Sequence, residues 1–142
     1  MNGNAELLNF IYQNAQMGTE TIKQILDIVK DDDFSKHLST QYDEYKQILS
    51  EARTLLNQNG YDEKGISAFE KLRTYLSINM QTLTDQTPSH ISEMLIIGSN
   101  MGVVNAIKNL KHYPNADAHI RSLMERLLQS EENNIQQLKI FL

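Results

Sequence analysis

Residues 87–111 read TPSHISEMLIIGSNMGVVNAIKNLK and predict a helix with apolar side chains almost all round it. Thr87 and Pro88 are typical of an N-cap followed by the first helical residue, where the missing N–H of proline costs nothing. A helix that is apolar on every side favours burial in the middle of a bundle. Gly98 and Gly102, four residues apart, would let a second backbone come close. We expect this segment to be the most buried helix of the chain.

Two glutamates interrupt the apolar faces of this segment and of the last segment of the chain. At 100° per residue, Glu93 lies on the same side of its helix as Ile97 and Val104. By the same count, Glu131 lies in line with Ile135. Both carboxylates are therefore predicted to point into the bundle.

The two glutamates are also predicted to lie at one level. If their helices form an antiparallel hairpin that turns near residue 112 or 113, Glu93 and Glu131 each lie about 19 residues from the turn. Two buried carboxylates without a cation are expected to share a proton or to be hydrogen-bonded, because burying isolated charges is costly. The alternative is a pair that contacts a metal ion or another ligand.

The apolar pattern of the remaining chain predicts further helices. We expect four core helices and one additional helix, over residues 5–29, 33–58, 88–111, 116–141 and 67–84, respectively. The acidic residues 31–33 can cap a helix start, and Asn59 with Gly60 is typical of a helix end. Ser67 and Glu70 have the spacing of a capping box ahead of the additional helix.

Composition supports an all-α protein with a single domain over residues 1–142, because the chain contains only two prolines and six glycines. The N-terminus has neither the basic segment nor the apolar segment of a signal peptide, and no apolar run reaches membrane-spanning length. We expect a cytoplasmic protein without membrane contact. A net charge of −5 opposes binding to nucleic acid. The chain has no cysteine, which excludes disulfides and thiolate metal ligands.

The first hairpin contributes to the same polar layer. With a turn near residue 31 or 32, Gln41 lies opposite Thr21 and Ile22, and Tyr45 lies opposite Gly18. The Tyr45 hydroxyl is positioned to donate a hydrogen bond to the layer.

Three segments resemble small bacterial members of the ferritin-like superfamily: MGTE at 17–20, EMLIIGSNMG at 93–102 and EENNIQQLK at 131–139. The resemblance covers nearly the whole chain. It implies an all-α, ferritin-like four-helix bundle (up-down-down-up) with an extra crossover helix. In that topology the helix that starts at Pro88 runs parallel to the helix over 33–58.

In metal-binding members of the superfamily, each half of a dinuclear site has one helix with a glutamate and one with Glu-x-x-His. The resemblance maps these glutamates onto Glu20, Glu44, Glu93 and Glu131. Gln47 and Asn134 stand where the histidines would be, and amides bind iron more weakly than imidazole does. Glu20 is expected to face solvent. We therefore predict a degenerate di-iron site, less than one equivalent of iron and no ferrous oxidation.

Two function classes remain. We expect a non-catalytic bundle protein without catalytic residues or a cofactor, which acts through self-association as a homodimer or through a protein partner. The alternative is weak binding of a divalent metal or a small ligand by the layer around Glu93 and Glu131, with contributions from Gln41, Glu44, Tyr45 and Asn134. The four histidines are expected to have surface roles, and no hydrolase triad or phosphate-binding motif is present.

Overall fold

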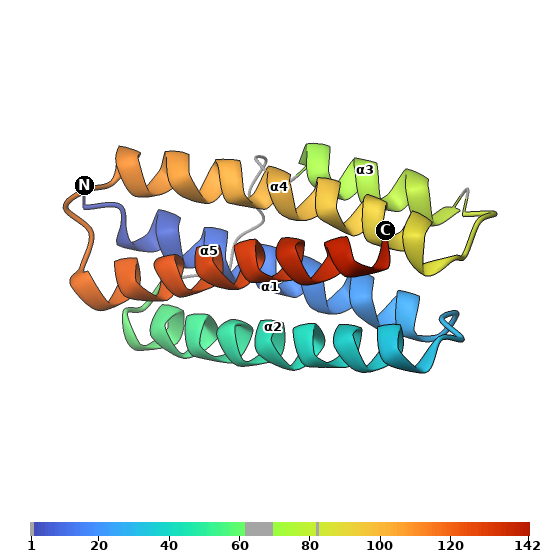
Figure 1. Ribbon diagram of the computed structural model, residues 1–142. Helices are drawn as coiled ribbons and strands as arrows, with labels where there is room; N and C mark the ends of the chain where they lie inside the picture. The colour runs from blue at the N-terminus through green and yellow to red at the C-terminus, as the bar shows by residue number, and fades with distance from the viewer. Residues whose placement is uncertain (1, 62–69, 82) are drawn as a thin grey trace.

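The computed structural model describes residues 2–61, 70–81 and 83–142, and it is all-helical over them. The helices are α1 (Asn4–Leu26), α2 (Asp32–Gln58), α3 (Glu70–Gln81), α4 (Pro88–His112) and α5 (Ala118–Leu138), followed by a 3₁₀ turn over Lys139–Phe141 (Figure 1). The all-α prediction is therefore confirmed. Within the described residues, none of the helices combines the length and apolar character needed to cross a bilayer.

The ends of several helices are set by the residues that the sequence pattern indicated. The Asp31 carboxylate accepts a hydrogen bond from the Phe34 N–H at 2.8 Å and so caps the start of α2. The Thr87 hydroxyl accepts one from the His90 N–H at 3.3 Å and caps α4, which begins at the proline. Gly60 follows α2 with a φ of 70°, the left-handed conformation that ends many helices.

Other boundaries differ by a few residues from the prediction. The helix α1 ends at Leu26 rather than at residue 29, and in the turn that follows the Ile28 and Val29 N–H groups both donate to the Ile25 carbonyl. The helix α5 gives way to the 3₁₀ turn before residue 141. Ser67 of the predicted capping box, like the predicted start of its helix, lies outside the described residues.

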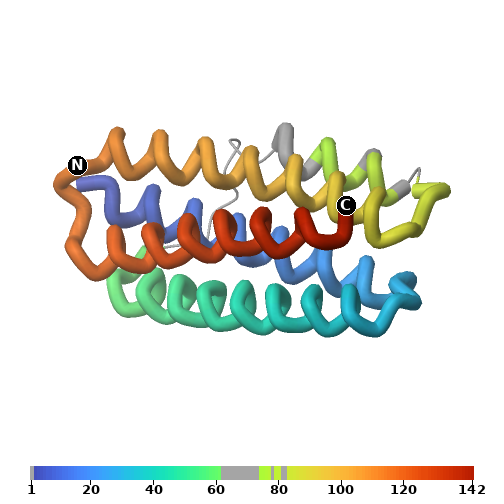
Figure 2. The backbone as a smooth tube through the Cα atoms, in the orientation of Figure 1, coloured from blue at the N-terminus to red at the C-terminus, as the bar shows by residue number. Residues whose placement is uncertain are grey.

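The described helices form two hairpins that share one hydrophobic core. α1 packs along α2 and α4 packs along α5, while α5 also contacts α1 and so joins the hairpins (Figures 1 and 2). The shorter α3 lies beside α4. Large side chains from both hairpins are completely buried, among them Leu7, Ile11, Phe34, Ile48, Ile120 and Leu127. The core fixes which side of each helix is available to a ligand or a partner.

The orientation of α4 differs from the predicted one. Its buried residues are Ile91, Ser92, Met94, Leu95, Gly98, Gly102 and Ala106. The predicted inner face is exposed instead, including Glu93 and Asn100 as well as Ile97 at 41 % and Val104 at 51 %. Because α4 is apolar almost all round, periodicity alone does not determine which side is buried. The prediction that Glu93 points inward is wrong.

Small residues explain the observed orientation of α4. Gly98, Gly102 and Ala106 lie along the buried side, where they allow close packing. A Cβ atom at Gly102 would lie 3.4 Å from Oδ1 of Asn14 on α1, which is about van der Waals contact. The neighbour of Gly102 is thus the Asn14 side chain, so the prediction that these glycines bring another backbone close stays a prediction.

Candidate functional site

The carboxylate of Glu131 lies inside the bundle, as the sequence predicted. Glu131 is in the second half of α5, on the side that also buries Leu127, Ile135 and Leu138, and only 2 % of it is exposed. The helix α5 is amphipathic, with polar residues on its outer side, so burial of its apolar stripe takes Glu131 into the core. A charged carboxylate in that position needs hydrogen-bond donors.

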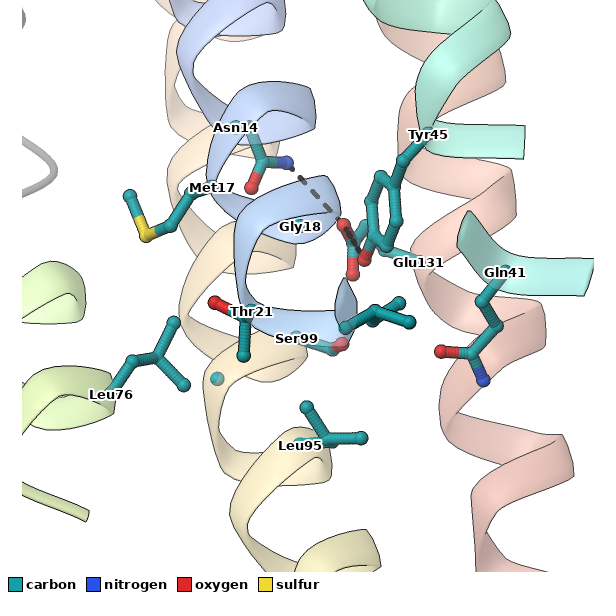
Figure 3. Close-up of a pocket in the computed structure, with 12 residues that line it drawn as sticks. Asn14, Met17, Gly18, Thr21, Gln41, Tyr45, Leu76, Leu95, Ser99 and Glu131 are labelled. Atoms are coloured by element: carbon teal, nitrogen blue, oxygen red, sulfur yellow. Dashed lines mark hydrogen bonds between the residues drawn. The ribbon is translucent and has the colours of Figure 1, made fainter. Parts of the chain in front are cut away.

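Two side chains from the first hairpin contact one oxygen of Glu131. The Tyr45 hydroxyl on α2 donates a hydrogen bond to Oε1 at 2.5 Å, and the Asn14 amide on α1 donates to the same oxygen at 3.5 Å (Figure 3). The prediction that Tyr45 donates to the polar layer is confirmed. The other oxygen, Oε2, is buried and has no hydrogen-bond partner among the described residues. A buried acceptor without a partner costs free energy, so this oxygen is a candidate contact for a bound molecule.

Gly18 makes room for the phenol ring of Tyr45. A Cβ atom at Gly18 would lie 2.8 Å from three carbon atoms of that ring, closer than real Cβ contacts allow. The absence of a side chain therefore lets the ring pass beside α1 toward Glu131. This contact confirms the prediction that Tyr45 lies opposite Gly18.

Burial changes the acid–base properties of both partners. Desolvation raises the pKa of Glu131 from 4.5 to about 7, and the hydrogen-bonding groups of Tyr45, Ser99 and Asn14 oppose part of this rise. Burial raises the pKa of the Tyr45 phenol well above 10, and the negative charge of Glu131 adds to this effect. Tyr45 therefore stays a neutral donor, while Glu131 changes its charge near neutral pH.

A small cavity of about 40 Å³ opens beside this carboxylate. Its polar wall includes Thr21, Gln41 and Ser99 in addition to Asn14, Tyr45 and Glu131. Its apolar wall includes Met17 and Leu95, and Leu76 of α3 lies at the side away from Glu131 (Figure 3). The cavity thus joins one ionisable oxygen acceptor to a short apolar surface.

The remaining members of the predicted layer have separate environments. Gln41 is buried and its Nε2 lies 2.7 Å from Nε2 of His37, which is half-buried rather than fully at the surface. Asn134 is also buried, and its Nδ2 has no hydrogen-bond partner among the described residues. Glu44 is half-buried on the flank of α2. Gln41 lines the cavity and Asn134 interacts with Tyr45, but Glu131 supplies the buried carboxylate.

The structure does not assemble the four glutamates that the ferritin-like resemblance suggested. Glu20 is exposed, as predicted, but Glu93 is exposed too and therefore does not form a buried pair with Glu131. Gln47 lies at the surface, where its Oε1 accepts a hydrogen bond from Nη2 of Arg126 at 3.3 Å. No group of three or more acidic or histidine side chains suited to a metal ion occurs within the described part of the chain. The prediction that Glu93 and Glu131 share one buried site is therefore wrong.

A second feature lies on the outer side of α4, and the sequence pattern alone did not predict it. Its residues are spaced alternately four and three positions apart, and we call them the outer stripe: Glu93, Ile97, Asn100, Val104, Ile107 and Lys111. All six are exposed, and even Ile107 is exposed by 37 %. The spacing is that of the contact positions in a coiled coil, and the charged residues at its two ends were a usable signal.

Comparison of the chain with models of known families, with curated proteins and with solved structures finds no match in any of the three. The chemistry around Glu131 and the outer stripe of α4 are the two features that point to a function.

Proposed function

We propose that this protein is a non-catalytic helical bundle that acts by self-association, with the outer stripe of α4 as the contact between two copies. The observation that carries the proposal is the exposure of Ile97, Val104 and Ile107 on one side of a single helix. Exposed apolar residues that form a continuous stripe are typical of interaction surfaces, whereas single ones are ordinary. Burying this stripe against an equivalent helix would remove the apolar area from water.

The charges at the ends of the outer stripe favour a second copy in an antiparallel arrangement. With a two-fold axis level with Gly102, Ile97 faces Ile107 of the second copy and Asn100 faces its Val104. The same register brings Glu93 level with Lys111 of the second copy. Each interface would therefore contain two complementary charge pairs, about 27 Å apart along the helix.

A parallel arrangement is disfavoured by the same charges. It would bring Glu93 beside Glu93 and Lys111 beside Lys111, and like charges in register are repulsive. A polar residue such as Asn100 at a contact position also restricts register and orientation at some cost in stability. The antiparallel homodimer is thus the arrangement that the stripe supports best.

The first test is sedimentation velocity over a range of protein concentrations. We expect a monomer–dimer equilibrium, and we expect Val104→Lys to raise the dissociation constant on the order of 100-fold, because it places an unpaired charge in the interface. Ile140→Lys is the matched control, since Ile140 is 73 % exposed and lies outside the outer stripe. A monomer at every concentration, or equal weakening by both variants, would overturn the proposal.

The register has its own test. Glu93→Lys and Lys111→Glu should each weaken the dimer, and the double variant should restore it, because the complementary pairs are then re-formed with exchanged signs. The chain has no cysteine, so single cysteines report contacts without background. A chain with Ile97→Cys should cross-link to one with Ile107→Cys faster than either cross-links to itself. Preferred cross-links between identical positions would indicate a parallel pair. If the outer stripe associates only with a helix of another protein, the proposal of a second copy would be wrong.

We also propose that the bundle has the ferritin-like, up-down-down-up topology that the sequence resemblance implies. In Figure 1, α1 and α5 run in one direction and α2 and α4 in the opposite direction, which supports this topology. The position of α3 beside α4 suits a helix in the long crossover connection. An experimental structure in which α4 runs antiparallel to α2 would contradict the proposal.

A further inference from the structure

We propose that the cavity beside Glu131 is a binding site for a small primary alkylammonium ion, whose N–H groups donate to the free carboxylate oxygen. Two observations carry this inference independently of self-association. The first is the buried Oε2 atom without a partner among the described residues, and the second is the open cavity against the same side chain. A donor on a ligand in this cavity could satisfy the buried oxygen.

The existing hydrogen bonds determine what kind of donor fits. Tyr45 and Asn14 both donate to Oε1, and the Ser99 hydroxyl also lies near the carboxylate, so a ligand at Oε2 would share its surroundings with Ser99. An ammonium group carries three N–H donors and a positive charge that neutralises the carboxylate. The hydroxyl and carbonyl oxygens of Thr21, Ser99 and Gln41 can accept its remaining hydrogen bonds.

The other wall of the cavity favours an organic cation over a bare metal ion. Met17, Leu76 and Leu95 offer no oxygen ligands, whereas hard metal ions need several oxygen ligands around them. An alkyl chain can pack against these side chains. The volume of about 40 Å³ accommodates about three water-sized groups, which matches the three non-hydrogen atoms of ethylammonium.

Binding should depend on pH, because the ammonium ion pairs with the ionised carboxylate. Glu131 has a pKa of about 7 in the free protein, so the ionised fraction rises about tenfold between pH 6 and pH 8. Tyr45 faces Glu131 from α2 and stays neutral in this range, while α1 and α4 present the neutral side chains of Asn14 and Ser99. His37 contacts Gln41, which lines the cavity, and burial lowers the pKa of His37.

The experiment is calorimetric titration of the full chain with ethylammonium chloride at pH 6 and pH 8. We expect saturable binding of one equivalent, an affinity about tenfold higher at pH 8, and proton release to the buffer at pH 7. Ethanol lacks the charge and tetramethylammonium lacks N–H donors, so neither should compete. Competition by potassium ions at equal concentration would show that the site takes any monovalent cation, and the proposal of an organic ligand would then be wrong.

Glu131→Gln keeps the size of the side chain but removes the charge, and it should abolish the binding of ethylammonium. Glu93→Gln is the matched control on the neighbouring helix and should bind as the wild type does. Retained binding in Glu131→Gln, or an absence of binding in wild-type protein up to millimolar ethylammonium, would overturn the proposal. Val104→Lys separates the two functional proposals, because it should bind ethylammonium normally even where it no longer self-associates.

Discussion

Glu131 and Glu93 occupy similar sequence contexts, but one side chain is buried and the other is exposed. Each stands in an apolar stripe of a long helix in the same hairpin, yet Glu131 is 2 % exposed and contacts Tyr45, whereas Glu93 lies at the surface. The difference comes from the helices rather than from the glutamates. The helix α5 has one apolar side, so its orientation is fixed, while α4 is apolar on both sides and is oriented by close packing of its small residues.

The different positions of the two glutamates give them different chemical properties. Glu131 supplies a carboxylate that titrates inside the bundle, and Glu93 supplies an exposed carboxylate at one end of the outer stripe. A chemical site and an association surface can therefore be separated by substitutions at these two positions.

The largest difference between the two glutamates should be in the pH dependence of stability. The folded-state pKa of Glu131 is raised from 4.5 to about 7, so the folded protein binds its proton more tightly than the unfolded chain does. This stabilisation is fully present below pH 4.5 and is lost as pH rises toward and through about 7, a change of about 3 kcal/mol. Denaturant unfolding from pH 4 to pH 8 would measure it.

Glu131→Gln should remove this fall in the free energy of unfolding between pH 4.5 and pH 7, because the amide does not titrate. Glu93→Gln should leave the wild-type slope in place. If the two variants show the same dependence on pH, Glu131 is not the group responsible.

The second-largest effect on stability is expected from alanine at Gly18, one of two glycines that face the bundle interior. Gly18→Ala would bring a Cβ atom within 2.8 Å of the Tyr45 ring, and we expect the displaced ring to cost about 2 kcal/mol in unfolding free energy. Gly102→Ala is the control, because its Cβ atom would lie 3.4 Å from Asn14 and a helical alanine is favoured over glycine by about 1 kcal/mol. Thermal unfolding should therefore show a clear loss only for Gly18→Ala. Equal losses would mean that Tyr45 is not held by Gly18.

Sequence patterns correctly predicted the all-α fold class and the contact of the first hairpin with the polar layer. The caps at Asp31 and Thr87, the placement of Tyr45 opposite Gly18, and the burial of Glu131 all depend on local geometry or on a single amphipathic stripe. The orientation of α4 could not be predicted in this way, because both sides of the helix are apolar. Its buried side includes the small residues Gly98, Gly102 and Ala106, to which a count of large apolar residues gives no weight.

A third, smaller effect should follow from removing the hydroxyl that contacts Glu131. Tyr45→Phe removes a donor that favours the ionised carboxylate, so the pKa of Glu131 should rise further. The loss in stability should be about 1 to 2 kcal/mol and larger at pH 8 than at pH 5, because the hydrogen bond is stronger to the charged form. Tyr42→Phe, a change at a half-buried tyrosine of the same helix, is the control. A loss that is identical at both pH values would show that the hydroxyl does not stabilise the charge of Glu131.

The smallest effect should be the influence of Glu93 on a neighbouring phenol. Burial raises the pKa of Tyr75 on α3, and the negative charge of Glu93 adds to this rise. Glu93→Gln should therefore lower the pKa of Tyr75, measured from its ring signals in an NMR titration, without changing the titration of Glu131. The effect should weaken in high salt, because Glu93 is exposed and its field is screened. An unchanged Tyr75 in the Glu93→Gln variant would mean that this carboxylate does not act on α3, and a change at Glu131 would mean that the two glutamates are coupled across the bundle after all.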